Sequence, residues 1–246
     1  MYISQTNSTN TWLKEHTECN VVWTSFQTAG RGQAGNSWES EAGKNLLFSM
    51  RLTKPQIAIH KQFAITMITS LAVLNVVKQL LPDSDATIKW PNDIYVGNEK
   101  ICGILIESTI ADKEIKEAIV GIGLNLNQTE WHNGAPNPTS VKLQTGEEVN
   151  IPDVRNALEQ NIREALTLLE KPEELKRQYL AVLYRFGQDA LYAEREVSVE
   201  PSKILKTRTS NAFEASIIDV TEQGELILNA RGKIKNYHFK EIQFIV

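Results

Sequence analysis

The chain has 246 residues, of which 41% are hydrophobic and 23% are charged, and its formal net charge is −4. This length can bury a substantial core, and the mixed, slightly acidic charge argues against a nonspecific nucleic-acid or membrane-surface binder. Cys19 and Cys102 lie far apart and form no CxxC pair, so we expect free thiols and a cytoplasmic protein.

Hydrophobic periodicity and turn residues predict alternating helices and strands in the first half of the chain. In order, we expect a helix over 9–16, a strand over 21–26, a Gly-rich loop over 28–44, a strand over 45–52, a helix over 60–81, and strands over 87–90, 94–96, 100–109 and 115–127. The long helix is apolar, but Asn75 and Lys78 interrupt it, so we expect a core helix and no membrane span.

The second half predicts two amphipathic helices followed by short strands. One apolar stripe runs from Val154 to Leu169 with Asp153 as the N-cap, and the other runs from Leu175 to Phe186 and ends at Gly187. From about Ala193 the residues alternate as in strands. We therefore expect an α/β (α+β) fold, with a mixed sheet and flanking helices over residues 1–188 and a small β-barrel domain over residues 189–246.

The loop segment Gly30-Arg31-Gly32-Gln33-Ala34-Gly35 matches G-x-G-x-x-G after a predicted strand. A dinucleotide-binding fold would need a helix at the third glycine and an acidic residue about twenty positions later, and neither is present. The loop can still bring backbone N–H groups and a guanidinium to a carboxylate or phosphate, although a solvated turn would look the same.

The segment Lys89-Trp90-Pro91-Asn92-Asp93, followed by Lys100 to Gly103, places two lysines, an amide and a carboxylate beside predicted core strands. Charges are costly next to a core unless a ligand of opposite charge binds there. Together with Ser8-Thr9-Asn10, the run Gln27 to Gly32, Trp38 and the run Gly121 to Asn125, this order and spacing resembles the biotin protein ligases.

The resemblance implies a class II aminoacyl-tRNA-synthetase-like ligase domain with an SH3-like C-terminal domain, and it fits the short class without a DNA-binding domain. It implies ATP, biotin and Mg²⁺ as substrates and cofactor. Biotin and ATP would give biotinyl-5′-AMP, and a lysine of a carboxylase carrier domain would then take the biotin. Positioned cations would stabilise the charge that builds up on the phosphate oxygens.

The resemblance also assigns site residues. The catalytic cations are Arg31, Lys89 and Lys100. The biotin site comprises Ser8, Thr9, Asn10, Gln27, Gly30, Arg31, Gly32, Gln33, Lys100 and Gly103. The ATP and adenylate site comprises Arg31, Trp38, Lys89, Asn92, Asp93 and Asn125. Each lysine could also be a solvated strand-end charge, and the Ser-Thr-Asn run could cap a helix. No residue spacing predicts a metal site formed by protein side chains.

One position departs from the family pattern. The family's loop usually carries a second arginine two residues after the first, whereas this chain has Gln33. A lost charge-assisted hydrogen bond is worth about 1.5–3 kcal/mol. Either the adenylate is held less tightly or another cation, such as Lys44 or Arg51, compensates; we expect the adenylate to be retained.

Two alternatives remain open at this point. A lipoate protein ligase shares the fold and the acyl-adenylate chemistry, although the KWPND segment and the arginine loop favour biotin. A biotin-sensing regulator is disfavoured by the absence of predicted DNA-binding helices and by the acidic balance. We expect the carrier domain as the macromolecular partner, with no nucleic acid and no membrane, and the sequence does not indicate the oligomeric state.

Overall fold

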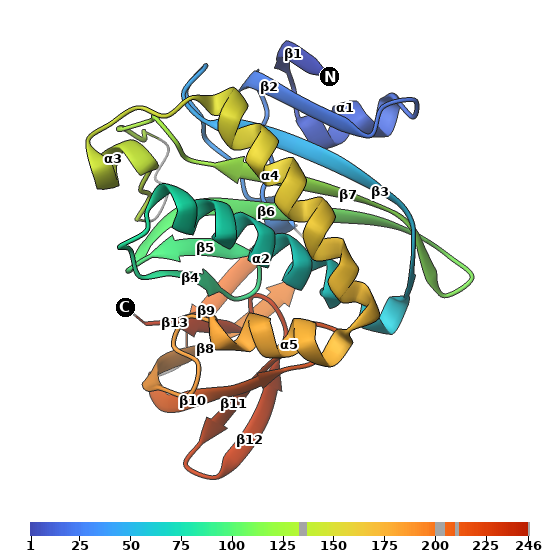
Figure 1. Ribbon diagram of the computed structural model, residues 1–246. Helices are drawn as coiled ribbons and strands as arrows, with labels where there is room; N and C mark the ends of the chain where they lie inside the picture. The colour runs from blue at the N-terminus through green and yellow to red at the C-terminus, as the bar shows by residue number, and fades with distance from the viewer. Residues whose placement is uncertain (133–136, 200–204, 210–211, 246) are drawn as a thin grey trace.

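The computed structural model describes residues 1–132, 137–199, 205–209 and 212–245, and it contains two β-sheets (Figure 1). The strands of the larger sheet, from one edge to the other, are β1 (Tyr2–Thr6), β2 (Val21–Gln27), β3 (Leu46–Ala58), β7 (Glu114–Leu124), β6 (Glu99–Ala111), β5 (Asp93–Val96) and β4 (Ala86–Lys89). Strand β1 runs parallel to β2 and the other neighbours are antiparallel, so the sheet is mixed, as the sequence predicts.

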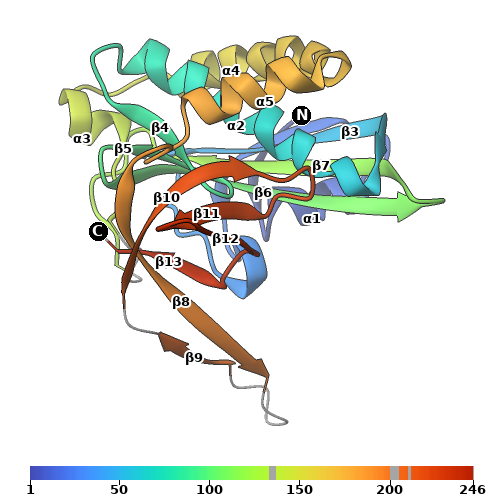
Figure 2. The same ribbon diagram turned by 90° about the horizontal axis from the view of Figure 1, so that it is seen from below.

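Helices cover the two faces of this sheet unequally. The helices α2 (Phe63–Leu80), α4 (Ile151–Ala165) and α5 (Pro172–Ala181) lie on one face, and α1 (Thr9–Glu15) lies on the other (Figures 1 and 2). By length and composition α2 could cross a membrane, but most of it is buried against the sheet, α4 and α5. It is the core helix that its interrupted apolar sequence predicts.

The two-residue period of the central strands decides which side chains reach each face. In β3, Phe48 and Met50 belong to the large core beneath the helices, whereas Ser49 hydrogen-bonds to residues of α1 on the opposite face. In β6, Cys102 and Ile104 point into the same core, which leaves Gly103 for the opposite face. That opposite face carries the candidate site.

The second sheet is antiparallel and begins where the sequence changes to short strands. Its strands are β8 (Asp189–Val199), β9 (Leu205–Thr209), β10 (Phe213–Val220), β11 (Leu226–Ala230), β12 (Lys233–Tyr237) and β13 (Ile242–Phe244). The order is β12-β11-β10-β8-β13, and β9 pairs with β8. Its buried residues, such as Ile217 and Tyr237, join the core cluster of the larger sheet, and the division at residue 188 stays a prediction.

Trp90 connects the two sheets at this junction. Its indole Nε1 donates to Gly224 O at 2.9 Å, and its ring meets Phe239 edge-on at 6.4 Å. Lys176 of α5 also pairs with Asp219 of β10 at 2.8 Å. The C-terminal strands are therefore packed directly beside the segment that contains Lys89 and Trp90.

Two expectations about element ends were wrong. Helix α4 is capped by Asn150, whose side chain accepts from Asp153 N at 3.2 Å, so Asp153 lies in the first turn. Helix α5 ends at Ala181, not at Gly187, because Val182 and Tyr184 leave the helix and hydrogen-bond to Ile88 of β4. This strand-like pairing overrides the helical period of the side chains.

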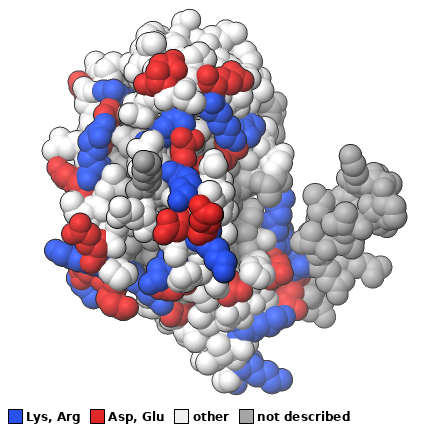
Figure 3. Space-filling view, turned by 90° about the vertical axis from the view of Figure 1, so that its right-hand side faces the viewer, with Lys and Arg blue, Asp and Glu red and all other residues white. Residues whose placement is uncertain are grey.

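The sequence does not predict several short or edge elements. These are β1, α3 (Val141–Thr145) and the 3₁₀ turns η1 (Gln33–Gly35), η2 (Ile59–Lys61) and η3 (Leu166–Glu170). Strand β1 is polar and mostly exposed at the sheet edge, so it carries no apolar signal. Both cysteines are free thiols, as expected. Acidic and basic side chains intermingle on the face in Figure 3, without a large patch of one sign.

Candidate active site

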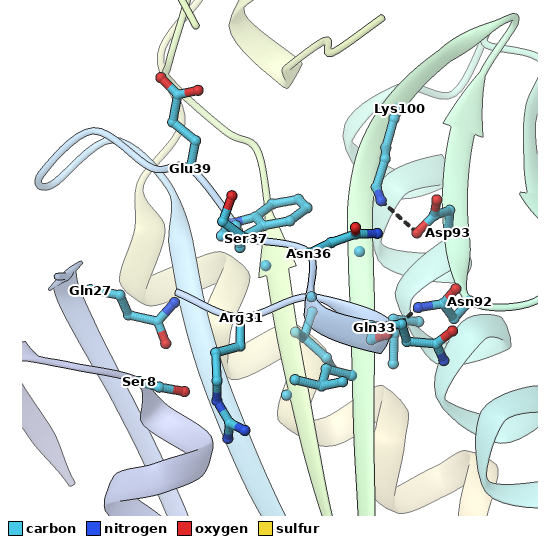
Figure 4. A pocket seen from close by; sticks show the side chains of 18 of the residues that line it. Ser8, Gln27, Arg31, Gln33, Asn36, Ser37, Glu39, Asn92, Asp93 and Lys100 are labelled. Carbon is cyan, nitrogen blue, oxygen red and sulfur yellow. Dashed lines mark hydrogen bonds and ion pairs between the residues drawn. The ribbon is translucent and has the colours of Figure 1, made fainter. Parts of the chain in front are cut away.

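A cavity of about 630 Å³ lies between the loop after β2 and the face of the sheet opposite the large helices. Figure 4 shows the loop residues facing Asn92, Asp93 and Lys100 across this space. Of the residues that the sequence predicts for the site, the cavity is lined by Ser8, Thr9, Asn10, Gln27, Arg31, Gly32, Gln33, Trp38, Asn92, Asp93, Lys100, Gly103 and Asn125. Segments more than a hundred residues apart thus meet in one pocket.

Glycines form the floor because larger residues would not fit beneath Trp38. Gly103 and Gly123 are direct partners on β6 and β7, and the Trp38 indole lies against both. A Cβ atom added to Gly123 would lie 2.4 Å from Trp38 Cε2, and one added to Gly103 would lie 2.7 Å from Trp38 Cζ3. The glycine pair therefore allows an aromatic side chain to lie flat on the sheet.

The polar wall comes from the start of α1. Ser8 occupies the N-cap position, but its hydroxyl makes no capping hydrogen bond, so it is available to the pocket. The backbone N–H of Thr9 donates to Gln27 Oε1 at 2.8 Å, and the Thr9 hydroxyl donates to the same oxygen at 3.1 Å. This pairing fixes the orientation of the Gln27 amide.

A buried serine joins the members of this wall. Ser49 Oγ lies 2.7 Å from both Thr9 Oγ1 and Asn10 Oδ1, and Ser49 is fully buried. Asn10 packs so closely on β7 that a Cβ at Gly121 would lie 2.3 Å from Asn10 Oδ1. The hydrogen bond from Ser49 and the close packing on Gly121 thereby hold the Asn10 amide in one orientation.

The opposite end of the pocket carries an ion pair. Lys100 Nζ lies 2.7 Å from Asp93 Oδ1, and both side chains are about a quarter exposed (Figure 4). Lys100 Nζ also lies 5.6 Å from the centre of the Trp38 ring. Asn92 is buried and donates to Ile104 O, while Ile104 N donates to Asn92 O at 3.0 Å. The turn after the cis Trp90–Pro91 bond is thus held against β6.

Arg31 points away from this ion pair in Figure 4. Its guanidinium makes two hydrogen bonds to the Glu107 carboxylate, at 3.1 and 2.8 Å. Lys14 and Asn10 donate to the same carboxylate, at 2.7 and 2.9 Å. Burial raises the pKa of Glu107, but these hydrogen bonds outweigh it and hold the pKa below its usual value.

Two predicted residues do not line the cavity. Gly30 is not among the lining residues, and a Cβ atom added to it would lie 2.5 Å from Trp38 O. Lys89 points into an aromatic cluster, with Nζ 4.2 Å from the Tyr95 ring centre, 5.4 Å from that of Phe244, and 3.1 Å from Tyr95 Oη. Burial lowers the pKa of Lys89. Tyr95 lines the pocket and Lys89 does not, so the direct phosphate contact expected of Lys89 is not seen here.

Two buried polar atoms of the pocket lack hydrogen-bond partners among the described residues. These are Asn125 Oδ1 and Trp38 Nε1. The other end of the Asn125 amide donates to Thr139 O at 2.9 Å, so the free oxygen is an oriented acceptor. Such unpaired groups are costly in a buried position and indicate where a ligand would hydrogen-bond.

The structure also bears on the missing second arginine. Gln33 lines the cavity on the η1 turn, where the family pattern would place a charge. Lys44 pairs with Glu148 at 3.6 Å, and the buried Arg51 binds Glu117 and the carbonyl of Leu13. Neither side chain lines the pocket, so neither supplies a replacement charge there. Retention of the adenylate stays a prediction.

Sequence reasoning missed several residues of the site. Ser49 and Glu107 organise the polar wall, and Tyr95, Trp131 and Phe239 line the cavity. A hydroxyl and a carboxylate within otherwise apolar strands were the available signals for Ser49 and Glu107. No local signal identifies Phe239, because it reaches the pocket only through the packing of the C-terminal strands on Trp90.

Comparison with known proteins places this geometry in a family. Residues 2–125, slightly more than half of the chain, match the Biotin/lipoate A/B protein ligase family. The chain belongs to this family. Both the mixed sheet and the pocket residues up to Asn125 fall within the matched segment.

Several curated relatives are similar to the chain. It is 28% identical over 232 residues to the bifunctional ligase/repressor BirA of Bacillus subtilis, with 92% of the chain and 66% of the relative covered. It is 30% identical over 134 residues to the biotin–[acetyl-CoA-carboxylase] ligase of Mycobacterium tuberculosis, with 51% of the chain and 48% of the relative covered. The chain thus spans less than two thirds of the length of these relatives.

The fold is similar to that of solved ligases. The biotin protein ligase from Aquifex aeolicus, in complex with biotin and ATP, superposes with a TM-score of 0.78 at 21% identity. The match covers 99% of this chain and 97% of that chain. The predicted fold class, a mixed sheet with flanking helices and a further small antiparallel sheet, is confirmed.

Proposed function

We propose that this protein is a biotin protein ligase, which forms biotinyl-5′-AMP from biotin and ATP and transfers biotin to a lysine of a carboxylase carrier domain. The observation that carries the proposal is the shared pocket, in which an oriented polar wall (Ser8, Thr9, Asn10 and Gln27) and the Lys100–Asp93 pair line one cavity. The ureido ring of biotin has two N–H donors and a carbonyl acceptor that need hydrogen-bond partners, and a carboxylate approaching a phosphate needs a cation.

The first step joins the two substrates. A carboxylate oxygen of biotin attacks the α-phosphorus of ATP, the bond to the β-phosphate breaks, and pyrophosphate leaves. Lys100 lies at the end of the pocket away from the polar wall, which supports a role for its ammonium in stabilising negative charge on the phosphate oxygens. Arg31 supplies a second cation from the loop.

Asn125 and Trp38 support the nucleotide half of the proposal. The unpaired Asn125 Oδ1 can accept a hydrogen bond from the exocyclic amino group of adenine, and the Trp38 indole offers an aromatic surface. Among the described residues, no group of three His, Cys, Asp or Glu side chains could hold a metal ion. We therefore assign Mg²⁺ to the nucleotide, as part of the MgATP substrate.

The second step transfers biotin to the carrier. The neutral lysine amine attacks the acyl carbon of the adenylate, AMP leaves, and the amine loses a proton. Asp93, beside Lys100 at the pocket wall, is the carboxylate that we expect to orient the incoming lysine. The names of the relatives as biotin–[acetyl-CoA-carboxylase] ligases support a carboxylase carrier as the partner, and we propose that the reaction takes place in the cytoplasm.

One experiment tests the proposal directly. The protein is incubated with a biotin carboxyl carrier domain, biotin and MgATP, and intact-mass spectrometry measures the carrier. We expect a single biotin increment on one lysine, and we expect no increment without ATP. An unmodified carrier would contradict the proposal. Isothermal titration with biotin and with lipoate separates the two ligase classes, because binding of lipoate alone would identify a lipoate ligase instead.

A further inference from the structure

Both cations that line the pocket, among the described residues, are already paired with protein carboxylates. Lys100 is paired with Asp93 at 2.7 Å, and Arg31 is paired with Glu107 at 2.8 Å. Glu107 itself is not part of the cavity wall, and it lies on β6 beside Asn10. A substrate anion that recruits Arg31 must therefore compete with Glu107.

The surroundings of Glu107 allow this exchange. When Arg31 leaves, the carboxylate keeps Lys14 at 2.7 Å and the Asn10 amide at 2.9 Å, so its charge is still neutralised and hydrogen-bonded. A partly buried carboxylate without those partners would strongly oppose the loss of its only cation. The Arg31 side chain is 41% exposed, whereas that of Glu107 is 21% exposed, so the arginine is the more accessible partner to a ligand.

The loop that carries Arg31 is lightly attached. Within residues 31–37 it is held by a short turn, in which Gly32 N donates to Asn36 O at 2.7 Å, and by a bridge between Arg31 and Ser37. None of the described residues in this stretch belongs to a hydrophobic core cluster. Rearrangement of the Arg31 side chain therefore disturbs few contacts.

We propose that Glu107 is a positioning residue that pairs with Arg31 before the substrate binds. When the substrate binds, Arg31 leaves Glu107 and pairs with the substrate carboxylate instead. The identity of the substrate as a carboxylic acid rests on the proposed function. The pairing of Arg31 with Glu107 in the free protein does not.

The test compares biotin with biotinol, its neutral alcohol analogue, by isothermal titration. The measured quantity is the ratio of the dissociation constant of biotinol to that of biotin. Glu107→Gln keeps an acceptor for Asn10 but removes the competing charge, so we expect the ratio to rise about two- to five-fold, the scale of one partly exposed ion pair. Lys14→Gln makes Glu107 depend more on Arg31, so we expect the ratio to fall.

Two further variants make the result specific. Arg31→Gln should lower the ratio and abolish the effect of Glu107→Gln in the double variant. Glu114→Gln makes the same chemical change at an exposed ion pair with Lys116 on the same sheet and should leave the ratio unchanged. An unchanged or lower ratio in Glu107→Gln would overturn the exchange and leave Glu107 with a purely structural role.

A second measurement is independent of biotin. Limited trypsin digestion of the unliganded protein should cleave after Arg31 faster in Glu107→Gln than in the wild type or in Glu114→Gln, because the side chain is released. Equal cleavage rates would contradict the resting pair. If the wild-type protein bound no biotin, the proposed function would be contradicted. Faster cleavage of the Glu107→Gln variant would still support the pairing of Arg31 with Glu107.

Discussion

Replacing Ser49 by alanine removes the hydroxyl that connects the members of the polar wall. Ser49 is fully buried, and its Oγ lies 2.7 Å from Thr9 Oγ1 and from Asn10 Oδ1. Asn10 is itself only 2% exposed, so water cannot replace the lost partner without rearrangement. Leaving a buried acceptor unsatisfied costs about 1–3 kcal/mol, which is the expected loss in the free energy of unfolding.

The chain offers a matched control in Ser70. Ser70 is also fully buried, but its hydroxyl has no hydrogen-bond partner among the described residues. Ser70→Ala should therefore be neutral or slightly stabilising, since it removes a buried polar group that forms no bond. Urea denaturation of both variants, with thermal unfolding as a second measure, gives the comparison; about 2–4 °C per kcal/mol is expected for a chain of this size.

The same substitution should weaken biotin binding. Without Ser49, the Thr9 hydroxyl and the Asn10 amide lose the contact that orients them towards the pocket. A loss of about 1 kcal/mol corresponds to roughly a five-fold higher dissociation constant. The reasoning would be refuted if Ser49→Ala and Ser70→Ala had the same stability within about 0.5 kcal/mol, and biotin affinity were unchanged.

Three further predictions concern the charged end, the C-terminal strands and pH. Lys100→Ala should lower the rate of pyrophosphate release about 10²–10³-fold, the scale for one lost charge-stabilising donor. The same change at the exposed Lys116 should leave the rate unchanged. A near-wild-type rate in Lys100→Ala would show that Lys100 does not act in the site. Phe239→Ala should weaken substrate binding roughly five-fold by removing an apolar wall of the cavity, with Ile234→Ala, 64% exposed, as the control; equal affinities would contradict this. The pKa of Glu107 is lowered in the folded protein, so its contribution to stability is present above the unfolded pKa and is lost as the pH falls through the folded pKa. In urea denaturation, Glu107→Gln should therefore lose less stability than the wild type on acidification. Parallel curves of stability against pH would refute this assignment.

Local sequence determined the main elements of the larger sheet and its helices. The spacing of Ala64, Leu71 and Val77 predicts α2, and Gly97-Asn98 predicts the hairpin between β5 and β6. The chemistry of the site was also readable, because lysines, a carboxylate and a glycine-arginine loop beside core strands are costly without a ligand of opposite charge. Thirteen of the residues that the family resemblance assigns to the site line one cavity.

Tertiary structure alone decided how those residues are used. The strand register places Gly103 beside Gly123 and so makes room for Trp38, and no local pattern encodes that register. The sequence also does not predict the side-chain directions of Lys89 and Arg31, because a cation next to a strand can reach a ligand, an aromatic cluster or a carboxylate. The tertiary structure decides both directions. Lys89 packs against Tyr95 on the neighbouring strand and against the distant Phe244, and Arg31 pairs with the distant Glu107.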